Sequence, residues 1–130
     1  MAPAAANTIA DFLKDTSSSP SDFDMILTGD LGKVGSRLLC ELLQKDCGID
    51  IESVHADCGL LLYDIEKQDV HAGGGCGASV LNSYIMRRLE SGELSRVLFV
   101  ATGALMSPTS SLQGESIPSI AHAVLLSKPT

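Results

Sequence analysis

The sequence predicts a layered α/β fold, a mixed β-sheet covered by α-helices. Helical patterns and short apolar strand patterns alternate along the 130 residues, which favours strands joined by a helical crossover. Hydrophobic residues make up 45% of the chain and aromatic residues only 4%, so we expect an aliphatic core. This length corresponds to one domain.

The amino-terminal part contains two helical patterns separated by a strand. Residues 3–14 form the first predicted helix, because proline suits a first turn and the apolar side chains share one face. Residues 24–30 are a continuous apolar strand that ends at a glycine turn. Residues 34–45 form the second predicted helix, which Gly48 ends. Its expected buried stripe consists of Leu38, Leu39, Leu42 and Leu43.

The middle of the chain contains two ambiguous segments and a glycine-rich turn. Residues 49–56 are predicted as a loop or a short strand, and residues 58–63 fit either a strand or the end of a helix. Residues 71–79 are a tight turn, because each glycine costs about 1 kcal/mol against alanine in a helix. A buried helix is predicted over residues 78–89. At least one turn glycine is expected to have a positive φ, among Gly73, Gly74, Gly75 and Gly77.

Two strands complete the predicted sheet, residues 96–103 and residues 118–127. The first of them and the strand at residues 24–30 both end in a Thr-Gly pair. If these two strands are parallel, their carboxyl ends meet at one edge, where open α/β sheets bind ligands. We therefore expect Asp30 and the loop after Gly103 to lie at one rim of the sheet.

The charge and the cysteine pattern exclude several classes of protein. A net charge of −7 argues against a non-specific nucleic-acid binder and against attraction to an anionic membrane surface. No apolar run approaches the ~20 residues that span a bilayer, and the N-terminus lacks the charged segment of a signal peptide. Without C-x-x-C pairs or His-x-x-x-His patterns, we expect no metal and no cofactor. We expect reduced thiols in a cytosol-like compartment, at Cys40, Cys47, Cys58 and Cys76.

Few residues are candidates for chemistry. Cys76 lies at a helix start, where a thiol pKa is lowered, although a small packing residue is the alternative. His71 and His55 are candidate general bases or oxyanion donors or, alternatively, polar turn and loop residues. His122 lies in an apolar strand, as a core or rim histidine or as a catalyst. The dispersed aspartates are expected to be mostly solvated turn residues, namely Asp24, Asp30, Asp57 and Asp64.

Six segments carry a resemblance to a known family. They are residues 1–9, 24–31, 57–61, 71–76, 96–109 and 115–122. In this order they resemble the stage V sporulation protein AD family of endospore-forming bacteria. The resemblance implies a thiolase-like fold, in which two similar α/β halves pack as alternating helix and sheet layers. Residues 1–130 then correspond to a single carboxyl-terminal half-domain.

The resemblance also implies a function in spores. Members of the family bind dipicolinic acid and help to move it, as the calcium chelate, into the developing spore. They work with channel proteins of the same sporulation stage, at the periphery of the spore inner membrane. The glycine run is then the candidate ligand-binding loop, with Gly73, Gly74, Gly75 and Cys76.

An enzyme is the alternative that the resemblance leaves open. Thiolase-fold enzymes carry their nucleophilic cysteine in the amino-terminal half, so that role is not transferred to Cys76. The chain is expected to be non-catalytic on its own, or else an acyltransferase component that needs a separate amino-terminal half. Its candidate residues would be Cys76, His71 and His122. A half-fold should also expose an apolar face, so a homodimer is a further expectation.

Overall fold

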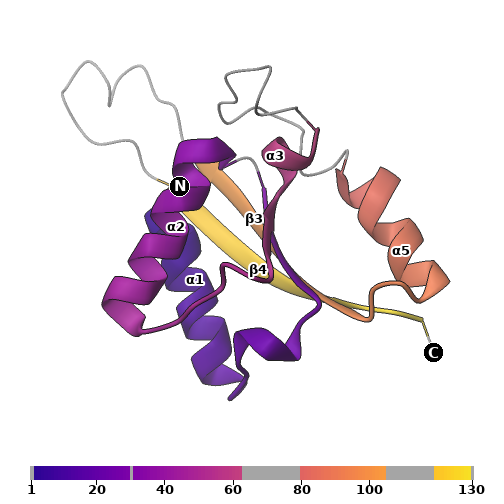
Figure 1. Ribbon diagram of the computed structural model, residues 1–130, viewed down its shortest axis with the longest axis horizontal. Coiled ribbons are helices and arrows are strands. Elements are labelled where there is room, and N and C mark those ends of the chain that lie inside the picture. The colour runs from indigo at the N-terminus through magenta and orange to yellow at the C-terminus, as the bar shows by residue number, and fades with distance from the viewer. Residues whose placement is uncertain (1, 30, 63–79, 105–118, 130) are drawn as a thin grey trace.

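The computed structural model describes residues 2–29, 31–62, 80–104 and 119–129 (Figure 1). Within these ranges the strands form a mixed four-stranded sheet with helices on both of its faces. The predicted layered α/β fold is thereby confirmed.

The sheet has the strand order β2-β1-β3-β4. β1 (Met25–Thr28) pairs in parallel with β2 (His55–Asp57) on one side and with β3 (Arg96–Ala104) on the other. β4 (Ser119–Ser127) pairs antiparallel with β3 and forms an edge. The crossover between parallel strands is therefore confirmed, and the short strand predicted as one alternative within residues 49–56 exists as β2.

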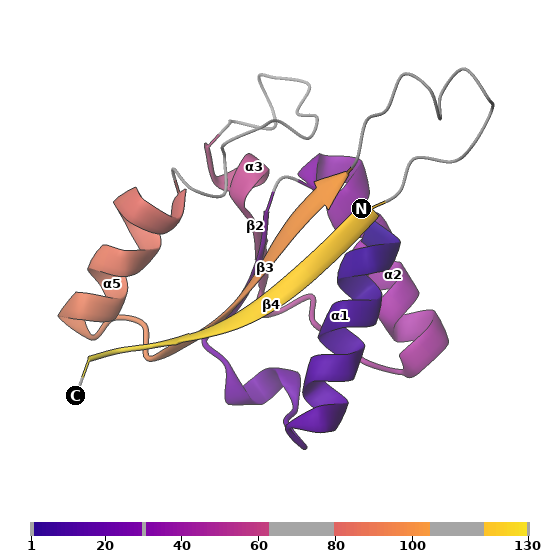
Figure 2. The same cartoon turned by 180° about the vertical axis from the view of Figure 1, so that it is seen from behind.

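Two helices cover one face of the sheet and a shorter helical segment lies on the other (Figures 1 and 2). α1 (Ala2–Asp15) and α2 (Gly32–Cys47) lie side by side and enclose the larger core with β1, β3 and β4. On the opposite face, a π-helical turn (Leu81–Ile85) continues into α5 (Met86–Ser91). A smaller core lies beneath them, with Leu27, Cys58, Val80, Ile85, Leu89 and Val97.

The second helix differs from its predicted pattern in two respects. α2 begins at Gly32, two residues before the predicted start, and ends as predicted at Gly48, which has a φ of 66°. Leu39 and Leu43 are fully buried, but Leu38 is 40% exposed, so its prediction as a core residue was wrong. The buried arc is centred on Ser36, Leu39 and Leu43, at helical spacing. Leu38 lies outside this arc because each residue turns by about 100°.

The remaining segments resolve one ambiguity and leave one prediction open. Residues 58–63 were compatible with strand or helix, and the structure has α3 (Cys58–Leu62) there. The helix predicted over residues 78–89 is confirmed from Val80 onward, and it ends at Gly92 with a φ of 84°. The glycine turn at residues 71–79 lies outside the described residues, so its positive φ stays a prediction.

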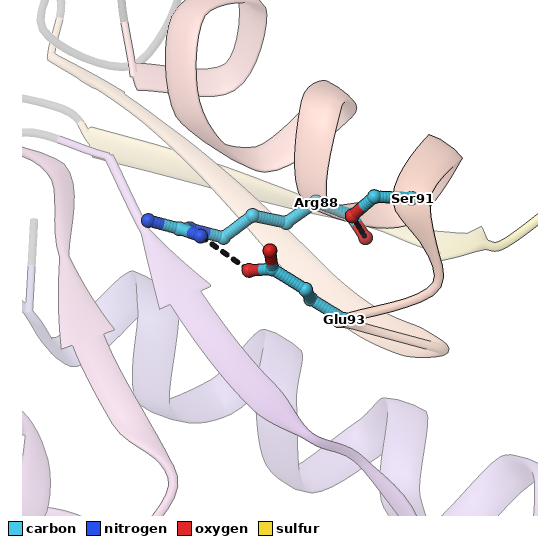
Figure 3. A network of polar contacts seen from close by, with 3 residues as sticks. All are labelled: Arg88, Ser91 and Glu93. Atoms are coloured by element: carbon cyan, nitrogen blue, oxygen red, sulfur yellow. Dashed lines mark hydrogen bonds and ion pairs between the residues drawn. The ribbon is translucent and has the colours of Figure 1, made fainter.

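The turn after α5 is held by an exposed ion pair (Figure 3). Arg88 and Glu93 are paired, and the Ser91 hydroxyl donates to the Arg88 carbonyl oxygen at 3.1 Å. The Arg88 guanidinium also lies 4.0 Å from the centre of the Tyr84 ring. Because both charged side chains are well exposed, this pair orders the turn more than it stabilises the fold.

One face of the sheet is only partly covered. Alternate residues of β4 point to the α5 side, where Leu126 joins the smaller core. Further along the same strand, Ile120 is 56% exposed and Val124 is 52% exposed. The sheet was expected to be covered by helices, which holds on both faces for β1 but was wrong for β4.

Candidate functional site

The carboxyl ends of β1 and β2 bring two polar side chains together in the interior. Thr28 and Asp57 are directly opposite each other in the parallel register, and both are essentially buried. The Thr28 hydroxyl donates to Asp57 Oδ1 at 2.6 Å. A buried carboxylate is costly unless its oxygens accept hydrogen bonds, so the surroundings of Asp57 decide its role.

Backbone amides satisfy the rest of the Asp57 carboxylate. Oδ1 accepts from the Leu31 N–H at 3.0 Å, and Oδ2 accepts from Gly32 at 3.0 Å and from Gly59 at 3.1 Å. Two of these amides open α2 and the third lies in the first turn of α3. Asp57 therefore fixes the starts of two helices, where a negative charge suits the helix dipole.

The Thr28–Asp57 contact also fixes the proton on His55. The single hydroxyl proton of Thr28 is donated to Asp57, so its oxygen accepts from His55 Nε2, which lies 2.9 Å away. His55 Nε2 thus carries the ring proton and Nδ1 presents a lone pair. Burial lowers the pKa of His55, against the opposing effect of the Asp57 charge, and favours this neutral ring.

The free lone pair of His55 faces a thiol. Cys40 Sγ lies 4.0 Å from His55 Nδ1, at the long end of a sulfur hydrogen bond. Burial raises the pKa of the Cys40 thiol, and the charges of Glu52 and Asp50 raise it further. The resting pair is therefore a neutral thiol beside a neutral imidazole, the arrangement of a nucleophile with its general base. The hydrogen bonds from His55 to Thr28 and from Thr28 to Asp57 orient this imidazole.

Sequence reasoning missed most of this cluster. Asp57 was expected to be a solvated turn residue, which was wrong, because it is buried and accepts four hydrogen bonds. His55 was considered as a general base or a loop residue, and it lies in β2. Cys40 was expected to be a reduced thiol and Thr28 to end a strand, but neither was considered as a site residue. The available signal was a threonine and an aspartate that each end a strand, at adjacent carboxyl ends.

The structure places few of the predicted site residues. His122 lies in β4, opposite Ala101, and is exposed on the α5 side of the sheet between Ile120 and Val124. The other candidates lie outside the described residues, so their predicted roles stay predictions: His71, Gly73, Gly74, Gly75 and Cys76. Asp24 is exposed as expected, and its carboxylate accepts from the amides of Ser95 and Arg96.

Two findings concern metals and membranes. Within the described ranges, no three side chains of His, Cys, Asp or Glu are grouped to hold a metal ion. None of the helices in these ranges has the length and apolar character required to cross a bilayer.

Comparison with known proteins gives a consistent match. A family model described as Stage V sporulation protein AD (SpoVAD) matches residues 1–127. Stage V sporulation protein AD of Bacillus subtilis (strain 168) is 47% identical over 130 residues. The alignment covers 98% of this chain and 38% of that protein. The chain thus spans well under half the length of this relative.

Proposed function

Because the chain belongs to the stage V sporulation protein AD family, we propose that it contributes to binding and uptake of dipicolinic acid by the developing spore. The sporulation role follows from the family itself. The choice of dipicolinic acid as the ligand, free or as its calcium chelate, rests on the resemblance of six ordered segments that include the glycine run. The match over residues 1–127 is the observation that carries the proposal.

The proposed unit is a thiolase-like half-domain that needs further polypeptide to complete its site. The chain covers 38% of the relative's length, so family members contain additional chain that must pack somewhere. The exposed α5 side of β4, with Ile120 and Val124, is the apolar surface that we assign to this contact. Exposed apolar patches of this kind commonly mark interaction sites. The proposed partner is an amino-terminal thiolase-like half.

A titration tests the ligand and the half-site together. Dipicolinate is titrated calorimetrically into the chain alone and into the chain co-expressed with the amino-terminal remainder of the Bacillus subtilis relative. Isophthalate, which lacks the ring nitrogen, serves as the control ligand. We expect heat of binding only when dipicolinate is titrated into the co-expressed pair. Tight one-to-one binding by the chain alone would contradict the half-site, and no binding by the pair would contradict the ligand.

A matched pair of variants tests the contact surface. Val124 and Leu125 are consecutive in β4 and both exposed, but they point to opposite faces of the sheet. Val124→Lys should prevent co-purification of the two halves because it places a charge in an apolar contact. Leu125→Lys should leave the pair intact. Equal behaviour of the two variants would place the contact elsewhere.

One structural observation favours the acyltransferase hypothesis. His122 lies on the same exposed face as Val124, so an added half-domain would bring it into an interface. Turnover of an acyl-CoA by the reconstituted pair, lost in His122→Ala, would establish that activity. Absence of turnover by the pair would reject it. Cross-linking in the same preparations would detect the proposed channel proteins. Light scattering would detect a homodimer by its mass.

A further inference from the structure

A cleft beside α2 contains the Cys40–His55 pair. The cleft has a volume of about 490 Å³ and lies between α2 and the turn that precedes β2. Cys40 and Ser36 are one helical turn apart on the same face of α2. We call this site the Cys40 cleft; its walls include Ser36, Arg37, Cys40, Glu41, Glu52 and His55.

A wall of the Cys40 cleft contains a buried hydroxyl, that of Ser36, which has no hydrogen-bond partner among the described residues. Ser36 is 7% exposed. An unsatisfied buried hydroxyl costs about 1–3 kcal/mol, so such groups are rare and call for an explanation. Ser36 lines the cleft, so its hydroxyl would be satisfied by turning toward a polar group of a small molecule bound there.

We propose that Cys40 is a modification site, where the thiol forms a mixed disulfide with a small cationic disulfide bound in the Cys40 cleft. In the reaction, the Cys40 thiol proton passes to His55 Nδ1 while Sγ attacks one sulfur of the disulfide. A new S–S bond forms and the original S–S bond breaks. The leaving thiolate takes the electron pair and then the proton from His55, so the released product is one free thiol.

The surroundings of Cys40 make a base necessary. Partial burial raises the pKa of the Cys40 thiol, and the carboxylates of Glu52 and Asp50 raise it further, so little thiolate forms unaided. Exchange requires the thiolate or a base that removes the proton during attack. His55 can act as this base because Thr28 holds the ring proton on Nε2, which leaves Nδ1 unprotonated beside Cys40 Sγ.

The charges of the cleft select the class of disulfide. Glu41 and Glu52 line it, and among the described lining residues Arg37 is the single cation. Asp50 adds a third carboxylate nearby. A cationic disulfide should therefore react faster than a neutral or an anionic one of equal size, and added salt should reduce this difference.

Disulfide exchange on the folded chain tests the proposal. The probe is cystamine, a small cationic disulfide, and peptide mapping by mass spectrometry follows each cysteine separately. Cys47 is the internal control, because it is exposed on the same helix. We expect Cys40 to react about tenfold faster than Cys47 near pH 7, although its thiol is harder to ionise. A slower reaction at Cys40 would overturn the proposal.

Two variants separate base assistance from simple access. His55→Gln retains an amide donor for Thr28 where Nε2 stands, but it has no basic nitrogen. It should slow Cys40 about tenfold and leave Cys47 unchanged. Ser36→Ala, a favourable change in a helix, should slow Cys40 about threefold by removing the polar contact to the ligand. Unchanged Cys40 rates in both variants would refute the mechanism.

A fold control accompanies the variants. Cys58 is fully buried, so its labelling reports unfolding of the chain. If His55→Gln exposes Cys58, the dependence of the Cys40 rate on pH in the unaltered chain decides instead. With His55 as the base, this rate should level off near neutral pH, whereas an unassisted thiol accelerates up to its own raised pKa. Continued acceleration above neutral pH would exclude His55 as the base.

Discussion

The Thr28 hydroxyl donates to Asp57 Oδ1 at 2.6 Å, across the carboxyl ends of two parallel strands. This bond joins a structural function and a chemical one. On one side, Asp57 holds the amides at the starts of α2 and α3. On the other side, Thr28 sets the protonated nitrogen of His55.

Asp57→Ala should destabilise the fold by about 3 kcal/mol, because it leaves three backbone amides and the Thr28 hydroxyl without their acceptor. Urea unfolding measures the loss. Asp46→Ala is the control, since Asp46 is exposed in the last turn of α2, where a negative charge opposes the dipole. A loss at Asp57 as small as that at Asp46 would show that the carboxylate does not hold these helices.

His55 should make the stability of the fold depend on pH. Burial lowers the pKa of His55 in the folded state below the ordinary value of 6.5. As the pH falls through 6.5, the unfolded chain binds a proton that the folded chain does not. The free energy of unfolding should therefore decrease as the pH falls, and level off below the folded-state pKa.

Urea unfolding of the original chain and of His55→Gln tests this dependence between about pH 7.5 and about pH 5.5, a range above most carboxylate titrations. The variant has no titrating ring at this position, so its slope should be flatter. Equal slopes for the two chains would mean that His55 is not the group responsible.

Two consecutive leucines of α2 should differ strongly in their contribution to stability. Leu39 is fully buried in the core beneath α1 and α2, whereas Leu38 is 40% exposed. Leu39→Ala should cost about 2–5 kcal/mol, since it removes packing and leaves a cavity. Leu38→Ala should cost well under half as much, measured by the same chemical denaturation. Similar losses would imply that something covers Leu38 in solution.

Much of the fold could be predicted because its strands and helices have clear apolar periods. The Thr-Gly ends of β1 and β3 do meet, since the strands are parallel and Thr102 Oγ1 donates to the Gly29 carbonyl oxygen at 2.6 Å. The β2–α3 segment was ambiguous because three strand residues followed by five helical residues are too short for a period. The exposure of Leu38 depends on which neighbours α2 has, which its own sequence does not encode.

The candidate site could not be predicted for a different reason. Cys40 lies in a helix, whereas His55 begins a short strand and Asp57 ends it, and their spacings match no motif. Only the parallel register of β1 and β2 brings Thr28 opposite Asp57 and close to His55. Asp57 was misjudged because aspartates near glycines are usually turn residues, while here the glycine amides are the donors.

Gly48 and Gly103 allow the cost of a left-handed backbone to be measured separately from that of lost space. Among the described residues, a Cβ added at Gly48 would meet nothing within 4 Å, and one at Gly103 would meet only the Ile120 side chain at 3.9 Å. Space is therefore ample at both, but only Gly48 has a positive φ, 66°, where it ends α2. Gly48→Ala should destabilise the fold by about 1 kcal/mol through backbone strain alone.

Gly103→Ala should be neutral or slightly stabilising, because alanine restricts the unfolded chain and fits the extended backbone of β3. Thermal unfolding of both variants under identical conditions measures the difference. If Gly48→Ala proves as stable as Gly103→Ala, the end of α2 must adopt another conformation without cost, and Gly48 is not what stops the helix.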